Sequence, residues 1–100
     1  MLSVIILTKN EEDVIVDCID SVKELADEIL VVDSQSQDRT VEIAQHFGAQ
    51  IIRRTFKNFS DQRNFAIQHT RGPWVLYIDA DEKATSEFKK EVRAVVENHQ

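Results

Sequence analysis

Apolar and polar positions along the chain fall into four successive blocks. The first block opens with the β-branched run at residues 2–8, and between residues 11 and 25 the apolar side chains recur at intervals of three and four. The run favours a strand, and the spacing favours an amphipathic helix. The block therefore predicts a strand followed by a helix.

The same order of strand and helix repeats three more times. The further predicted strands cover residues 28–33, 50–54 and 74–79. Residues of the types that cap helix N-termini precede the further predicted helices: Ser36 or Asp38, then Ser60, which opens a helix to about residue 69, then Thr85 or Ser86. The residues expected to face the core from these three helices are Val41, Ala44, Phe47, Phe65, Ala66, Phe88, Val92 and Val95 or Val96. Four β/α units thus fill one domain, residues 1–100.

Strands that alternate with helices of this length pair in parallel through right-handed crossovers. The sequence therefore predicts an α/β fold with three layers, a Rossmann-like parallel sheet covered by helices on both faces. The only glycines, Gly48 and Gly72, lie at helix-to-strand turns. A dinucleotide fingerprint or a P-loop needs glycine in a strand-to-helix loop, so this sequence has neither.

Composition and charge narrow the function classes. Lys and Arg number 12 against 18 Asp and Glu, a net charge of −6, which argues against nucleic acid as a partner. The single Cys18 shares the inward stripe of the first helix, which predicts a core thiol. The start of the chain shows no signal-peptide pattern and no apolar run is long enough to span a bilayer, so we expect a cytoplasmic protein.

Polar residues collect where the predicted strands end, which is where open α/β sheets bind ligands. Asp79 and Asp81 lie two positions apart after the fourth strand, so extended geometry points both side chains the same way. At about 5 Å and an effective dielectric of about 20, the two charges repel by roughly 3 kcal/mol. A divalent cation would relieve this repulsion, and hard oxygen ligands select Mg²⁺ or Mn²⁺. We therefore predict a metal site that holds the phosphates of a ligand.

Four ordered motifs, SVIILTKNEE, VVDSQSQDRT, SDQRNFAI and LYIDADE, resemble the first half of a family 2 glycosyltransferase with the GT-A fold. The resemblance covers nearly the whole chain, and the branch most similar acts in bacterial lipopolysaccharide-core assembly. It implies strand order 3-2-1-4 and inverting transfer of a sugar from a nucleotide donor, preferably a UDP-sugar, to a hydroxyl of a glycan or glycolipid in cell-envelope synthesis.

The resemblance also implies roles for particular residues. Asp79 and Asp81 stand at the metal-binding DXD motif, and Asp79 also belongs to the donor site. The other residues expected to bind the nucleotide-sugar are Thr8, Asn10 and Glu11 after the first strand, Asp33 after the second, and Arg63 in the third helix. Asp38 and Thr40 match a helix cap, which we interpret as structural.

The chain departs from the family in its length. GT-A enzymes are longer, and their second half supplies the catalytic base, whereas the glutamates after Asp81 fall on what we interpret as the solvated face of the last helix. We therefore expect a truncated chain that binds donor but is inactive in transfer. Loss of the second half would expose the edge of the fourth strand, so we expect self-association there. Any membrane contact would be peripheral, at the inner face.

Two other function classes also place aspartates after strands of an α/β fold. A D-x-D phosphatase would carry its aspartates on the first strand, and a receiver domain would carry its phosphoacceptor after the third, and neither pattern occurs. The basic residues Arg53, Arg54 and Lys57 are interleaved with Phe56 and Phe59, a pattern that also occurs in patches that bind RNA or lipid surfaces. A loop anchored by the two phenylalanines is the favoured interpretation. A non-catalytic α/β binding or interaction module remains the alternative.

Overall fold

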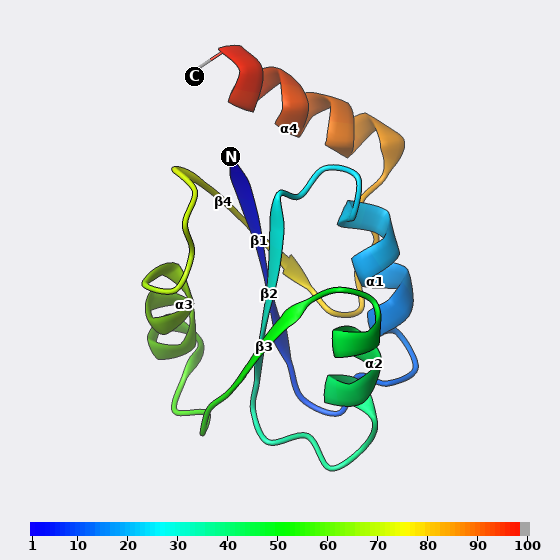
Figure 1. The fold of residues 1–100 in the computed structure, drawn as a ribbon, viewed down its shortest axis with the longest axis vertical. Helices are drawn as coiled ribbons and strands as arrows, with labels where there is room; N and C mark the ends of the chain where they lie inside the picture. Colours follow the sequence, from blue (N-terminus) through cyan, green and yellow to red (C-terminus); the bar gives the residue numbers. More distant parts are fainter. Residues whose placement is uncertain (99–100) are drawn as a thin grey trace.

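The computed structural model describes residues 1–98, which form four β/α units around one sheet (Figure 1). The elements in chain order are β1 (Leu2–Thr8), α1 (Ile15–Val22), β2 (Glu28–Asp33), α2 (Thr40–His46), β3 (Gln50–Arg53), α3 (Phe59–Ile67), β4 (Trp74–Asp79) and α4 (Ser86–Asn98). The strand ends at 2–8, 28–33 and 74–79 match those predicted from the apolar runs. The third strand ends one residue earlier than predicted.

The sheet is entirely parallel, and its strand order is β3-β2-β1-β4. The predicted α/β class and the order 3-2-1-4 are therefore confirmed. The register places Thr8 beside Asp33 and Leu7 beside Asp79. As a result, the carboxyl ends of β1, β2 and β4 lie level with one another at one end of the sheet.

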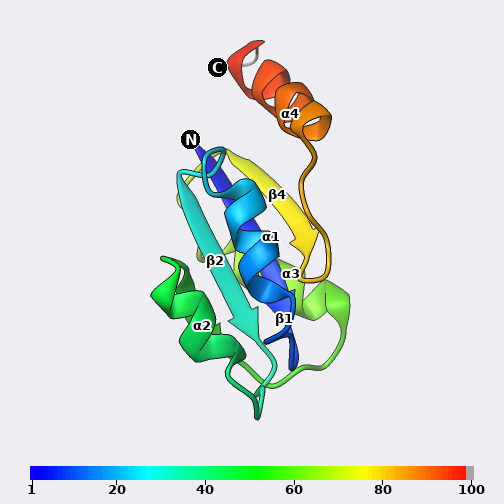
Figure 2. The same cartoon turned by 90° about the vertical axis from the view of Figure 1, so that its right-hand side faces the viewer.

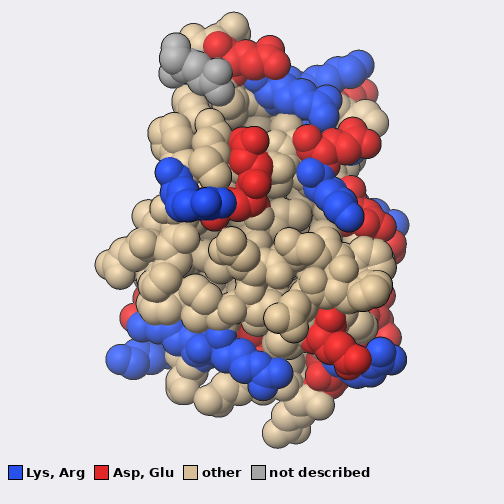
Figure 3. Space-filling model, in the orientation of Figure 1, with Lys and Arg blue, Asp and Glu red and all other residues tan. Residues whose placement is uncertain are grey.

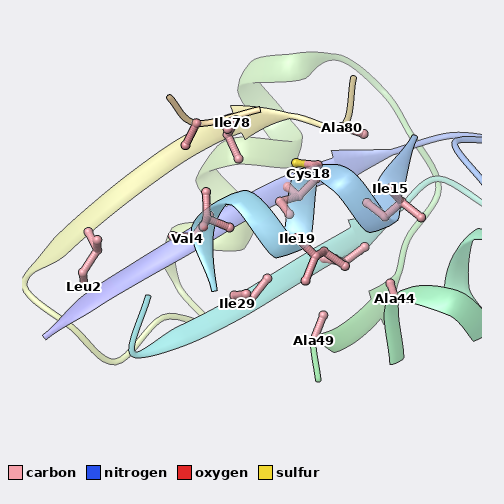
Figure 4. Packing of buried hydrophobic residues seen from close by; sticks show 14 residues of the cluster. Leu2, Val4, Ile15, Cys18, Ile19, Ile29, Ala44, Ala49, Ile78 and Ala80 are labelled. Atoms are coloured by element: carbon pink, nitrogen blue, oxygen red, sulfur yellow. The ribbon is translucent and has the colours of Figure 1, made fainter. Parts of the chain in front are cut away.

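Helices cover both faces of the sheet, which gives the three predicted layers. In Figure 2, α1 and α2 lie in front of the sheet and α3 lies behind it. On the α1 side, alternate strand residues such as Val4 and Val31 pack against Ile15, Cys18 and Ile19 of the helix (Figure 4). Cys18 is fully buried there, as predicted.

The core on the α3 side is smaller. Ile5, Leu30 and Val32 pack there against Ala66, and Phe65 is partly buried against them. The other buried residue of α3 is Gln62, whose amide lies where an amphipathic helix ordinarily places an apolar group. This face therefore combines a small apolar cluster with a buried polar side chain.

The last helix departs from the prediction. We expected Phe88, Val92 and Val95 or Val96 to face the core, but no residue of α4 is buried, and Phe88 and Val95 are 37% and 46% exposed. Only Val92 packs partly against the core. The reason is the position of α4, which lies beyond the amino-terminal ends of the strands instead of on a sheet face (Figures 1 and 2).

Helix ends also differ from their predicted positions. We expected a helix over residues 11–25, but α1 begins at Ile15 because the backbone of Val14 (φ −123°, ψ −15°) is not helical. Of the two expected caps for α2, Asp38 accepts hydrogen bonds from the backbone N–H and hydroxyl of Thr40, whereas Ser36 binds elsewhere. Thr85 accepts from the N–H of Phe88 at the start of α4, as expected.

β4 is an edge strand and pairs only with β1 among the described strands. Self-association through this edge stays a prediction. Over residues 1–98, none of the helices combines the length and apolar character that crossing a bilayer requires.

Candidate functional site

Asp33 joins the loops at the carboxyl ends of β1 and β2. Its side chain is fully buried. One carboxylate oxygen accepts from the hydroxyls of Thr8 and Ser36, each at 2.6 Å, and the other accepts from the backbone N–H of Ser36 at 2.7 Å. These internal hydrogen bonds occupy both oxygens, so the structure supports a positioning role, and the contact of Asp33 with a donor stays a prediction.

The loops after β1 and β2 are further fixed by Asn10 and Gln35, which adopt positive φ angles of 54° and 59°. The side-chain oxygen of Asn10 accepts from the backbone N–H of Gln37, and its own N–H donates to Ser36 Oγ. Asparagine tolerates this left-handed conformation better than most residues. Asn10 therefore shapes the loop, and direct contact with a nucleotide is not tested by these contacts.

The acidic pair lies at the end of β4, and the shared direction of its two side chains stays a prediction. Asp79 and Asp81 are both exposed, and Ala80 between them is buried. A turn follows, in which the N–H of Glu82 donates to the Asp79 carbonyl and a Glu82 carboxylate oxygen accepts from the Asp79 N–H. The turn thus uses backbone groups of Asp79 and leaves the two aspartate side chains exposed.

Contacts with α1 hold this turn in place. The Cys18 thiol lies 3.4 Å from the Asp79 carbonyl oxygen, Ser21 Oγ accepts from the Ala84 N–H, and Lys83 pairs with Asp17 at 3.6 Å. Burial, and then the nearby carboxylates of Glu82, Asp79 and Asp81, raise the pKa of the Cys18 thiol to about 12. Cys18 is thus a neutral core residue at the base of the acidic turn.

Glu11 lies among the other acids at the carboxyl ends of the strands. Burial, and then the negative charges of Asp81, Asp38 and Asp79, raise the pKa of Glu11 above its ordinary value of 4.5. By contrast, the pKa of Asp38 is lowered. Desolvation acts to raise it, but hydrogen bonds from Thr40 and from the Glu12 N–H together outweigh that effect. Of these two acids, Glu11 is therefore the one whose pKa is raised by its surroundings.

Replacing Glu11 by Gln is expected to stabilise the fold at neutral pH. A carboxyl whose pKa is raised on folding contributes its full stability below 4.5 and loses it as the pH rises through the folded-state pKa. Glu11→Gln removes that loss, so its melting temperature should exceed that of the original chain by about 2 °C at pH 7 and by nothing near pH 4. Thermal melts followed by circular dichroism at both pH values measure the difference; a lower melting temperature at pH 7 would contradict the repulsion.

A cavity of about 470 Å³ opens at the carboxyl ends of β1 and β2. It is lined by Thr8 and Glu11 after β1, by Ser34 after β2, and by Phe56 and Phe59 before and at the start of α3. Thr8 and Glu11 are donor-site residues predicted from the sequence. Glu11 lines the cavity and lies within electrostatic range of Asp79 and Asp81, so the cavity opens near the acidic pair.

The structure corrects the expectation that Phe56 and Phe59 anchor a loop. Phe56 and Phe59 are 43% and 61% exposed, and their rings meet edge to face at 5.1 Å beside the cavity. The segment is anchored instead by Arg54, which pairs with Asp61 at 2.6 Å and lies 4.2 Å from the centre of the Phe65 ring. Figure 3 shows positive charge gathered over the end of β3 and the segment that leads into α3. The alternation of aromatic and basic residues in the sequence was the signal that could have identified this side of the cavity.

Arg63 lies beside the cavity through its contact with Phe59. Its guanidinium is 5.8 Å from the centres of the Phe59 and Tyr77 rings, and its side chain is exposed. α3 begins at Phe59 and is capped by Asn58, whose side chain accepts from the Asp61 N–H, so the expectation that Ser60 opens this helix was wrong and Arg63 is in the second helical turn. The helix dipole has little effect at that position, because the effect falls off within the first turn. The Phe59 ring places Arg63 beside the cavity, and its contact with a nucleotide-sugar stays a prediction.

The donor set suits a hard divalent cation. The two aspartates offer carboxylate oxygens, which Mg²⁺ and Mn²⁺ prefer. Within residues 1–98 there is no cluster of three or more metal-ligating side chains. Two protein carboxylates would therefore leave most of a coordination shell to water and to ligand oxygens.

Comparison with known proteins identifies relatives of this chain. A glycosyltransferase of Rickettsia typhi is 41% identical over 98 residues, which cover 98% of this chain and 34% of the relative. The chain thus spans about a third of the length of the curated relatives that it matches first.

Solved structures share the fold. A mannosyltransferase from Pyrobaculum calidifontis, solved with GDP-Man and Mn²⁺, superposes with a TM-score of 0.80 at 25% identity over 94% of this chain and 31% of that one. Glucosyl-3-phosphoglycerate synthase from Mycobacterium tuberculosis, solved with Mn²⁺, UDP and glucosyl-3-phosphoglycerate, gives 0.72 at 28% identity over 80% of this chain and 33% of that one.

The sequence model of glycosyl transferase family 2 matches residues 3–100, which is nearly the whole chain. This match agrees with the strand order, with the acidic pair after β4 and with the related sequences. The chain therefore belongs to glycosyl transferase family 2.

Proposed function

We propose that this chain binds a nucleotide-diphosphate sugar, with the nucleoside in the cavity and the diphosphate held through a divalent metal at Asp79 and Asp81. The observation that carries the proposal is the position of Glu11, which lines the cavity and lies within electrostatic range of both aspartates. Two structural neighbours were solved with Mn²⁺ and with UDP or GDP-Man, which supports a nucleotide and a divalent metal as the ligands. Mg²⁺ and Mn²⁺ fit the carboxylates equally.

Different residues of the chain would bind different parts of the nucleotide-sugar. Phe56 and Phe59 supply an apolar wall to one side of the cavity, and Lys9, whose Nζ donates to the Gln35 carbonyl at 2.9 Å, supplies a positive charge. Arg63, beside Phe59, adds a second cation for the phosphates. A bound divalent ion would neutralise the diphosphate and stabilise it as a leaving group. Without that ion, the phosphates would meet the repulsion of the acidic turn.

The transfer step extends this proposal to the family's chemistry. We propose inverting transfer of the sugar to a hydroxyl of a glycan or glycolipid acceptor in cell-envelope synthesis, which rests on the resemblance of the motifs. The glutamates of α4 lie far from the acidic pair, because α4 is at the opposite end of the strands (Figure 1). This position supports the proposal that the glutamates of α4 do not supply the base for transfer.

Calorimetry with UDP-, GDP- and dTDP-sugars tests the binding. With Mn²⁺ present, one of these donors should bind to the chain, and removal of the metal by EDTA should weaken binding about a hundredfold, because repulsion of roughly 3 kcal/mol returns. Equal affinity with and without metal would overturn the metal-dependent part. Absence of binding by every donor would favour the alternative of a non-catalytic interaction module.

A further inference from the structure

Tyr77 lies on the face of β4 that α3 covers. Its register partner on β1, Ile5, packs in the core on that face, whereas Ile78, the next residue along β4, packs on the α1 side. Side chains of a strand alternate between faces, so Tyr77 and Asp79 both project toward the α3 side. Leu7, the register partner of Asp79, also packs on that side. The strand that carries the acidic pair thus presents an aromatic ring beside its first aspartate.

The Tyr77 ring contacts Arg63 of α3. The Arg63 guanidinium lies 5.8 Å from the centre of the Tyr77 ring and 5.8 Å from the centre of the Phe59 ring. The Tyr77 hydroxyl also donates to the Arg63 carbonyl oxygen at 3.4 Å. Across residues 1–98 no carboxylate forms an ion pair with Arg63, so its charge is available to an anionic ligand. Two rings from different segments thus hold one cation.

Arg63 lies between the two parts of the proposed site. Phe59 lines the cavity, and Tyr77 is two positions before Asp79 on the same face of β4. The guanidinium therefore contacts one ring from the cavity side and one from the side of the acidic pair. An exposed arginine loses rotamer freedom when it binds an anion, and contacts that hold it beforehand reduce this loss. Loss of either ring should thus weaken the binding of an anion at Arg63.

We propose that Tyr77 is a positioning residue for the donor diphosphate: its ring, together with that of Phe59, holds the Arg63 guanidinium between the cavity and the acidic pair. The inference rests on the proposed function, since it takes the diphosphate to be the anion that Arg63 binds. A guanidinium interacts with the face of an aromatic ring, so the role requires the ring of Tyr77 and not its hydroxyl.

A double-mutant cycle tests whether Tyr77 acts through Arg63. Calorimetry with Mn²⁺ measures the dissociation constant of whichever of UDP, GDP and dTDP binds most tightly. Tyr77→Ile keeps an apolar side chain that suits a strand and should weaken binding about threefold. Arg63→Gln should weaken it about tenfold. In the Arg63→Gln background, Tyr77→Ile should have no further effect, whereas a general disturbance of β4 would weaken binding in both backgrounds.

Two more variants separate the ring from the other properties of Tyr77. Tyr77→Phe keeps the ring and loses only the hydroxyl, so its affinity should return to within about twofold of that of the original chain. Phe88→Leu removes a ring of nearly equal exposure, 37% against 36% for Tyr77, from α4 at the opposite end of the strands. This control should leave the dissociation constant unchanged.

The outcomes separate this inference from the proposed function. If a nucleotide binds and Tyr77→Ile leaves its affinity unchanged, or weakens it equally in both backgrounds, the positioning role is overturned and nucleotide binding is retained. Equal losses in Tyr77→Phe and Tyr77→Ile, or unchanged affinity in Arg63→Gln, would overturn the role as well. If Tyr77→Ile does not fold, Tyr77→Leu takes its place in the cycle. If no nucleoside diphosphate binds with Mn²⁺, both proposals fail.

Discussion

Replacing Asp79 and Asp81 together by asparagine is expected to remove the metal-dependent part of donor binding. The double variant keeps the size of both side chains but removes two negative charges, so an ion at this turn loses its carboxylate ligands. We expect the dissociation constant measured with Mn²⁺ to rise about a hundredfold and to become insensitive to EDTA. Calorimetry with the tightest-binding donor measures both effects.

The fold should survive this substitution. Among residues 1–98, neither aspartate side chain takes part in a hydrogen bond or ion pair, and the turn depends on the backbone of Asp79, the side chain of Glu82 and contacts with α1. Removing two like charges beside Glu11 should raise the melting temperature slightly. A variant that lost binding and also unfolded would therefore contradict this account of the turn.

A matched control separates the site from net charge. Glu87→Gln with Glu91→Gln also removes two exposed acids, but on α4 at the opposite end of the strands. This variant should bind donor and Mn²⁺ as the original chain does. If both double variants weaken binding equally, long-range charge would explain the loss, and the metal site at Asp79 and Asp81 would be refuted.

The sheet could be predicted from the sequence because its signal is local. β1 and β2 are buried on both faces, and β1, β2 and β4 all appear as largely apolar runs that end in polar residues. Helix ends were less predictable, because contacts with distant segments fix them. At the start of α1, for example, the Glu11 N–H donates to Thr40 Oγ1, which lies 29 positions away.

The last helix illustrates what periodicity leaves open. The spacing of Phe88, Val92 and Val95 correctly predicted a helix with an apolar side, but it carries no information on what that side contacts. Here the connection after the acidic turn runs along α1, held by the Ser21 hydroxyl to the Ala84 N–H, and leaves α4 beyond the sheet. The position of the helix is thus a tertiary property.

The site was predicted in part for a similar reason. The acidic pair could be found because two carboxylates after an apolar strand conflict with electrostatics unless a cation binds. Phe56 and Phe59 were expected to anchor a loop, because apolar side chains usually pack, and only the structure shows them exposed at the cavity. The burial of Gln62 had no signal, since a glutamine in an amphipathic helix ordinarily faces solvent.

Replacing Asp33 by alanine is expected to cause the largest loss of stability. The substitution removes the acceptor of three hydrogen bonds and leaves the buried hydroxyls of Thr8 and Ser36 and the Ser36 N–H without that partner. Unpaired buried donors of this kind cost about 3 kcal/mol in total after partial compensation by water. For a chain of this size the melting temperature should fall by about 15 °C, measured by circular dichroism.

Two further variants decide what Asp33 does. Asp20→Ala removes an exposed carboxylate from α1 and should leave the melting temperature unchanged, which controls for loss of charge. Asp33→Asn retains one acceptor oxygen and should fall between the two. A melting temperature of Asp33→Ala within a few degrees of the original would refute the joining role. If Asp33→Asn kept its stability but lost donor affinity, the carboxylate would contact the nucleotide directly, because its internal hydrogen bonds would then be dispensable for the fold.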